Sequence, residues 1–210
     1  MDSAIFYDCE FLTAPGAPQR FWCGPCDPDP VIAQIGAVRL GLSKDFPILE
    51  AARWHVLPRG RDGARLPLDP LFVRLTGITE AVLDAEGLPL AEALGQLDTF
   101  AGGAPFWSWG KDEFNMLAIS CYVAGITPPI PATRFGNAAR LLLAAGVPHD
   151  EIVQLRSDRL ADHFDIAHTP LRGHDALDDA KSVAFTLQHL LRDGRLRSDA
   201  LTRPVPGDPA

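Results

Sequence analysis

The sequence predicts an α/β protein in which a mixed β-sheet is covered by helices. Strand-like runs come first along the chain, and later segments alternate between a short strand and amphipathic helices. Successive strands favour an antiparallel meander, whereas alternation of strands and helices is typical of α/β sheets. We therefore expect antiparallel strands first, parallel strands after them, and helices on the faces of the sheet.

The first half of the chain supplies the antiparallel strands. Residues 5–12, 31–40 and 53–57 are rich in β-branched and aromatic side chains, which predicts three strands. Residues 13–30 contain five prolines and are expected to form a loop. Residues 58–70 are rich in arginine, glycine and proline and predict a second loop, and residues 75–79 predict a turn that leads into a helical region.

The second half supplies helices and a buried strand. Residues 89–100 have apolar residues at helical spacing and predict a short surface helix. Residues 106–109 are aromatic and lie between glycines, which predicts a buried strand that runs into a helix at 112–124. Further helices are expected at 137–145 and 157–164, and the apolar rhythm of residues 176–191 predicts an amphipathic helix.

Composition indicates one domain without a membrane segment. The chain has 210 residues, of which 47% are hydrophobic and 22% are charged, and we expect a single domain at 1–195 followed by a disordered tail at 196–210. It has no run of 18 apolar residues and no signal-peptide pattern, so we expect a cytoplasmic protein. A net charge of -8 argues against non-specific adhesion to nucleic acid, although a nucleic-acid enzyme whose carboxylates hold cations stays open.

Cys23 and Cys26 belong to a Trp-Cys-Gly-Pro-Cys string that is typical of thiol-disulfide oxidoreductases. In such proteins a helix follows the string and lowers the thiol pKa. Here prolines at 28 and 30 oppose a helix. A thiol-disulfide oxidoreductase is therefore a minor alternative, beside a regulatory disulfide, a metal site or a loop without function.

Two carboxylates share one face of the first predicted strand. The period of two along a strand places Asp8 and Glu10 on the same side and Cys9 on the other. They are separated by roughly 7 Å, two residues at about 3.3 Å each, and repel each other inside an apolar core. A divalent cation would neutralise them, although pairing with an arginine is an alternative for either residue.

Further polar candidates lie near the start of two predicted helices. Asp179 lies at the edge of the apolar stripe of the last helix, and His174 precedes it by five positions, with Asp175 as the expected N-cap. Asp112 and Glu113 lie where the aromatic strand meets its helix. That helix is apolar nearly all round, so periodicity leaves open which of the two faces inward, and Asp112 also suits an N-cap.

Three motifs in order resemble the DEDD superfamily of 3′→5′ exonucleases, in its DEDDh or DnaQ-like branch. They are Asp8-Cys9-Glu10, then Ser108-Trp109-Gly110-Lys111-Asp112, then His174 through Asp179. Residues 34–40, 75–79, 160–164 and 176–180 give supporting matches, and the likeness runs from about 5 to 191. The middle motif and residues 176–181 are most similar to the Eri-like branch, which acts on RNA 3′ ends.

The resemblance implies a ribonuclease H-like fold and a metal-dependent exonuclease that releases nucleoside 5′-monophosphates from the 3′ end of RNA or single-stranded DNA. It implies two Mg²⁺ or Mn²⁺ ions, held by Asp8, Glu10, Asp112 and Asp179. His174 would take the proton of the attacking water. A catalytically silent nucleic-acid-binding module of the same fold is the main alternative.

The substrate contacts follow from the same resemblance. Phe11, Leu12 and Ile78 would pack against the terminal base and sugar, with plain core packing as the alternative for all three. The chain departs from the common pattern in its middle motif, where Gly110-Lys111-Asp112 is one residue short and Glu113 is the second choice for the acid. Hydroxyl residues that often follow the first motif are displaced to Thr13.

Overall fold

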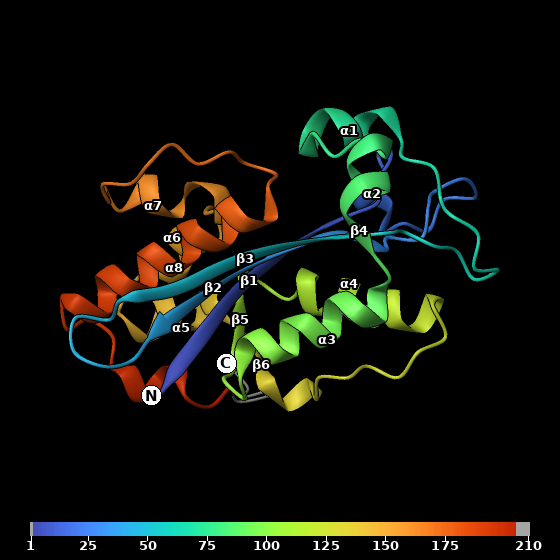
Figure 1. Cartoon of the computed structure of the whole chain (residues 1–210). Helices are drawn as coiled ribbons and strands as arrows, with labels where there is room; N and C mark the ends of the chain where they lie inside the picture. The colour runs from blue at the N-terminus through green and yellow to red at the C-terminus, as the bar shows by residue number, and fades with distance from the viewer. Residues whose placement is uncertain (1, 205–210) are drawn as a thin grey trace.

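A computed structural model of the chain describes residues 2–204 and contains, within them, a six-stranded mixed sheet (Figure 1). The strands are β1 (Ser3–Phe11), β2 (Ile32–Gly41), β3 (Ile48–Val56), β4 (Gly87–Leu88), β5 (Phe106–Ser108) and β6 (Phe135–Asn137). Their order in the sheet is β4-β3-β2-β1-β5-β6. β1, β2 and β3 pair antiparallel, and β5 and β6 continue the sheet in parallel with β1. The predicted fold class is confirmed.

Helices cover both faces of this sheet. They are α1 (Pro70–Thr76), α2 (Glu80–Glu86), α3 (Leu90–Ala101), α4 (Asp112–Val123), α5 (Ala138–Ala144), α6 (His149–Ile152), α7 (Leu160–His163) and α8 (Ala176–Arg192). α8, α5, α6 and α7 lie on one face, and α3 and α4 lie on the other (Figure 1). α2 lies beside β4, and α1 lies beyond α2 (Figure 1). None of the helices in residues 2–204 combines the length and apolar character needed to span a bilayer.

The central strand β1 separates two hydrophobic clusters. Ala4 and Phe6 pack in the cluster under α8 and α5, whereas Ile5, Tyr7 and Cys9 pack in the cluster under α3 and α4. This alternation is the period of two expected for an extended strand that is buried on both faces. It places the even-numbered residues of β1, including its two acidic ones, on the side of α8.

The start of α8 is held against β2. A Cβ atom on Gly36 would lie 2.2 Å from the backbone carbon of Ala176, so only glycine permits this approach. The Gln34 side chain accepts a hydrogen bond from the Ala176 amide at 2.9 Å. Asp175 caps the helix by accepting hydrogen bonds from the amides of Leu177 and Asp178, as the sequence predicts.

Several short elements depart from the predicted pattern. α1 (Pro70–Thr76) runs from the end of the loop expected at 58–70 into the turn expected at 75–79, and Asp69 caps it by accepting a hydrogen bond from the Leu71 amide. β4, β6 and α6 were not predicted. The helix expected at 157–164 is a 3₁₀ turn at Ser157–Arg159 followed by α7.

The packed core includes residues beyond 195, where a disordered tail was expected to begin. Leu196 and Leu201 are buried in the core under α8, and Ser198–Leu201 forms a 3₁₀ turn. The Trp107 indole donates a hydrogen bond to the Leu201 carbonyl at 3.1 Å. The chain therefore stays packed past the expected boundary at 195, and only 205–210 of the expected tail lies outside the described residues.

Candidate active site

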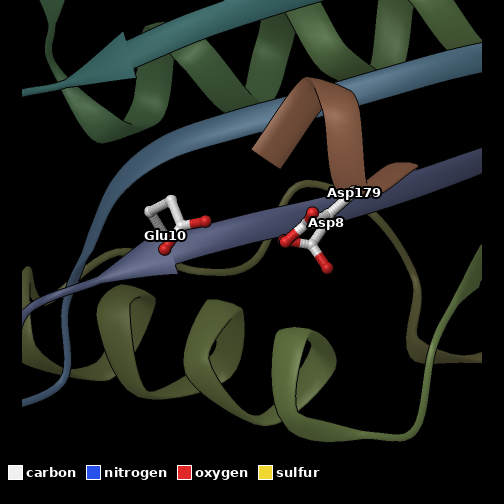
Figure 2. Close-up of side chains that lie close together, drawn as sticks. All are labelled: Asp8, Glu10 and Asp179. Atoms are coloured by element: carbon white, nitrogen blue, oxygen red, sulfur yellow. The ribbon is translucent and has the colours of Figure 1, made fainter. Parts of the chain in front are cut away.

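Three carboxylates meet at the contact between β1 and α8. Asp8 and Glu10 project from β1 and Asp179 projects from the first turn of α8 (Figure 2). One carboxylate oxygen from each lies within 4.8 Å of the others. The exposed fractions of the three residues are 5%, 9% and 6%. Residues that are about 170 positions apart in the sequence thus form one buried acidic cluster, which we call the carboxylate cluster.

Local structure explains this convergence. Asp8 and Glu10 share a face because β1 is extended, and their neighbours on the opposite face anchor the strand in the core. Asp179 lies one helical turn after the cap, and its amide donates a hydrogen bond to the Asp175 carbonyl at 2.9 Å. Arg53 holds that cap with an ion pair of 2.5 Å to Asp175. β2 and β3 therefore fix where Asp179 lies.

A fourth acid, Glu113, reaches the cluster from α4. Glu113 is 8% exposed, and its carboxyl group lies near Asp8 and Ser108, whose side chains lower its pKa against the larger, opposite effect of burial. Asp112 is exposed at the first position of the same helix. The structure thus brings Glu113, and not Asp112, to Asp8, and resolves the choice that periodicity left open.

Burial perturbs the acid–base properties of all four carboxyl groups. Loss of solvent raises the pKa of Glu10 to about 8 and the pKa values of Glu113 and Asp179 to about 7. The same loss raises the pKa of Asp8 well above its usual value, and the charges of Glu113 and Asp179 raise it further. Without a compensating cation, the cluster favours protonated carboxyl groups near neutral pH.

The donor set fits a hard divalent cation. Asp179 Oδ1 and Glu113 Oε2 are buried and have no hydrogen-bond partner within residues 2–204. Unpartnered buried carboxylate oxygens are costly unless a cation compensates them. Carboxylate oxygens are the ligands that Mg²⁺ and Mn²⁺ prefer. The residues present therefore match the metal chemistry that the sequence predicts.

His174 lies at the rim of the carboxylate cluster and not within it. It is half-buried in the loop before α8, with a left-handed φ of 60°. Burial raises the pKa of Asp179, and the nearby backbone of His174 has a smaller effect in the opposite direction. Its imidazole does not join the three ligands whose atoms lie within 4.8 Å of one another.

The three predicted substrate contacts occupy different environments. Leu12 and Ile78 are 2% and 3% exposed and belong to one hydrophobic cluster with Phe72, so core packing accounts for both. Phe11 is half-buried at the end of β1, and its ring stacks edge-on with Trp22 at 5.5 Å between centroids. Of the three, Phe11 follows Glu10 directly and retains an exposed surface.

Arg172 is a basic residue of the site that sequence reasoning missed. Its positive charge lowers the pKa of Glu10, although burial of Glu10 has the larger and opposite effect. Its guanidinium donates to the Leu75 carbonyl at 3.3 Å and lies against Gly77, where a Cβ atom would be 2.5 Å away. No sequence pattern identifies Arg172, because a single arginine in a loop belongs to no periodic or spaced motif.

The thiols of the Trp-Cys-Gly-Pro-Cys string are free in this structure. Cys23 and Cys26 are exposed and lie in a loop. Among the described residues, the next α-helix after Cys26 is α1, which begins only after β2 and β3. The helix that activates the thiol in oxidoreductases is therefore absent from its place.

Comparison with solved structures places this fold among those of the ribonuclease H-like 3′-exonucleases. The nuclease domain of 3′hExo, a DEDDh family member bound to rAMP, matches with a TM-score of 0.72 and 20% identity over 93% of this chain and 95% of that chain. Cell-death related nuclease 4 matches with a TM-score of 0.68 and 18% identity over 94% of this chain and 66% of its own. Exonuclease I of E. coli, in complex with a dT13 oligonucleotide, matches with a TM-score of 0.61 and 17% identity.

The match to Exonuclease I covers 90% of this chain but only 41% of the length of Exonuclease I. No protein-family model matches the chain, and no curated protein sequence matches it significantly. The likeness is therefore one of fold, because the sequence identity is only 20% in the match to the 3′hExo nuclease domain.

Proposed function

We propose that this protein is a metal-dependent 3′→5′ exonuclease that hydrolyses RNA or single-stranded DNA to nucleoside 5′-monophosphates. The observation that carries the proposal is the convergence of Asp8, Glu10 and Asp179 within 4.8 Å, on a fold shared with 3′-exonucleases. A buried group of carboxylates is unfavourable for stability alone, which supports a functional reason for its presence.

Asp8, Glu10, Asp179 and Glu113 would hold two Mg²⁺ or Mn²⁺ ions, with Glu113 in the place first assigned to Asp112. When bound, such a pair of ions would activate a water molecule and stabilise the charge that develops on the leaving 3′ oxygen. The protein's own contribution is a preorganised set of oxygens. β1 fixes two of them, α8 fixes the third and the first turn of α4 fixes the fourth.

Residues around the carboxylate cluster would orient the substrate. His174, at the rim, would receive the proton of the attacking water, a role that suits an imidazole with access to solvent. Arg172 is exposed near Glu10 and would pair with a phosphate oxygen. Phe11 would contact the terminal nucleotide with the exposed part of its ring at the end of β1, where the pairing with β2 shifts register after Glu10.

The test is product analysis with single-stranded RNA and DNA labelled at the 5′ end. With Mn²⁺ or Mg²⁺ we expect a ladder that shortens from the 3′ end, release of 5′-monophosphates, and no reaction with chelator. Asp8→Asn is the matched variant, since it keeps the size of the side chain and removes its charge. A catalytically silent binding module would bind the oligonucleotides without shortening them, and unchanged cleavage by Asp8→Asn would refute the site.

A further inference from the structure

A pocket lies beside the carboxylate cluster, where β5 and β6 end. Its volume is about 470 Å³, which is within the range of pockets that bind small organic groups. The end of β5, the first turn of α4, β6 and the start of α5 form its walls. The residues that matter for its chemistry are Ser108, Lys111, Phe114, Asn115, Phe135 and Asn137. We call it the β5–β6 pocket.

We propose that the β5–β6 pocket binds the nucleotide on the 5′ side of the scissile phosphodiester of a single-stranded substrate. The inference rests on the proposed function and adds a subsite to it. It concerns the part of the strand that stays with the enzyme after the terminal nucleotide has been cut off.

The pocket adjoins the carboxylate cluster at Ser108. Ser108 lines the pocket and lies near the Glu113 carboxyl group, which in turn affects the pKa of Asp8. The next residue after Glu113, Phe114, forms part of the pocket wall. A phosphodiester at the carboxylate cluster therefore has one of its two nucleosides at this opening.

The arrangement of elements around β1 indicates which of the two nucleosides lies at the pocket. Phe11 and Arg172, proposed for the terminal nucleotide, lie at the Glu10 end of the cluster, next to the turn after α1. β5 and β6 lie on the other side of β1 from β2. The terminal nucleotide and the β5–β6 pocket are thus on opposite sides of the carboxylates, and the pocket is left for the strand on the 5′ side.

The pocket wall combines an aromatic surface with positive charge. The rings of Phe114 and Phe135 lie 5.4 Å apart between centroids, and Phe114 is only half-buried, which leaves a surface on which a base can stack. Lys111 is exposed and makes no ion pair within residues 2–204, and Arg140 also lines the pocket. No carboxylate lines it, although the chain has a net charge of -8. Such a lining suits a base with its phosphate.

The side chain of Asn137 connects two walls of the pocket. Asn137 Oδ1 accepts hydrogen bonds from the Gly110 amide at 3.1 Å and from the Ala139 amide at 2.9 Å. Gly110 has a φ of 83°, which glycine adopts without strain, so the chain turns sharply before Lys111. The loop that carries Lys111 is therefore fixed to the start of α5, and the subsite is preformed.

The experiment compares substrates that reach the pocket with substrates that do not. The methyl esters of thymidine and uridine 5′-monophosphate carry the terminal nucleotide with only a methyl group on its 5′ side, whereas tetranucleotides of the same bases extend into the pocket. With Mn²⁺, Phe114→Ala should lower kcat/KM for the tetranucleotides by about tenfold or more, as expected for a lost stacking partner. Hydrolysis of the esters should stay within twofold.

Lys111→Ala should act in the same direction and should also weaken the salt dependence of tetranucleotide binding, because it removes a phosphate contact. Since Lys111 is exposed, this variant tests the pocket without disturbing the core. Tyr122→Ala is the matched aromatic control, because Tyr122 is 80% exposed at the far end of α4. Lys44→Ala, in the exposed turn between β2 and β3, is the matched basic control.

The outcomes separate this inference from the proposed function. An equal loss on esters and tetranucleotides would mean that Phe114 only positions Glu113, and this would overturn the subsite. Unchanged tetranucleotide kinetics in both variants would also overturn it, while the exonuclease would stand. If the wild-type protein hydrolysed neither substrate, the proposed function would fail and the subsite would fail with it.

Discussion

Gln34 and Ala176 are 142 positions apart, yet the Gln34 side-chain oxygen accepts a hydrogen bond from the Ala176 amide at 2.9 Å. The amide nitrogen of the same side chain bonds His55 at 3.0 Å, and His55 bonds Glu86 at 2.9 Å. A relay from α2 through β3 and β2 thus ends at the first residue of α8. Asp179 lies on that first turn, so the relay sets the position of one wall of the carboxylate cluster.

We predict that Gln34→Leu lowers the free energy of unfolding by about 1–3 kcal/mol, because it leaves the buried Ala176 amide without a partner. Exonuclease activity should fall with it, since α8 loses its attachment to β2. Chemical denaturation and single-turnover cleavage measure the two effects. Gln154→Leu is the control, because Gln154 is exposed and should change stability by about 0.5 kcal/mol or less. Equal stability and equal cleavage rates in the two variants would show that the relay does not position α8.

The two neighbouring acids of α4 should behave in opposite ways. Glu113→Gln removes the buried carboxylate near Asp8 and should lower kcat by about 100-fold or more, as expected when a metal ligand is lost. Asp112→Asn changes an exposed side chain and should leave kcat within about twofold. Steady-state kinetics on one oligonucleotide gives both numbers. The reverse order would restore Asp112 as the third acid of the site.

The metal-free protein should lose stability as pH rises from about 4.5 to about 8. Burial first, and neighbouring acids second, raise the pKa of Glu10 to about 8 and that of Asp179 to about 7. In this window the unfolded chain has released protons that the folded chain still holds, so the free energy of unfolding decreases with pH. Asp8→Asn removes one such group and should make the decrease smaller.

Urea denaturation in chelator at several pH values checks this slope. Saturating Mn²⁺ should reverse much of the loss at pH 8, because it binds the deprotonated form. Asp150→Asn is the control, since Asp150 is fully exposed. A wild-type slope equal to that of Asp8→Asn would show that the cluster does not titrate as a buried group.

A His174 variant separates proton transfer from metal binding. His174→Ala should lower kcat by about 100- to 10,000-fold, as expected for loss of a general base. Because His174 lies outside the group of three metal-facing carboxylates, Mn²⁺ affinity should change by less than about threefold. A pH–rate profile of the variant and a Mn²⁺ titration give the two readouts. Wild-type kinetics between pH 6 and pH 8 would exclude the general-base role.

The features that could be predicted from the sequence are those with a strong periodic pattern of apolar residues. The alternation in β1 placed Asp8 and Glu10 on one face, and the apolar stripe of α8 placed Asp179 at its edge. Asp175 is the cap that the sequence indicated. These features are local, so they can be identified before any long-range contact is known.

Features that depend on tertiary contacts could not be identified in this way. Glu113 could not be separated from Asp112 because α4 is apolar nearly all round, and only its packing against β1 shows which acid faces inward. β4 and β6 have two and three residues, too few for a period of two to show. Leu196 follows a polar stretch and gave no sign that it closes the core under α8.

The most direct test of the account is a calorimetric titration of Mn²⁺ into the wild-type protein and into Asp8→Asn at pH 8. We predict saturable binding to the wild-type protein, accompanied by release of protons that grows as pH is lowered toward 7, because ligation displaces protons from the buried carboxyl groups. Asp8→Asn should bind Mn²⁺ at least about tenfold more weakly. Equal binding by the two proteins, or no binding by the wild-type protein, would contradict the central claim that these acids form a metal site.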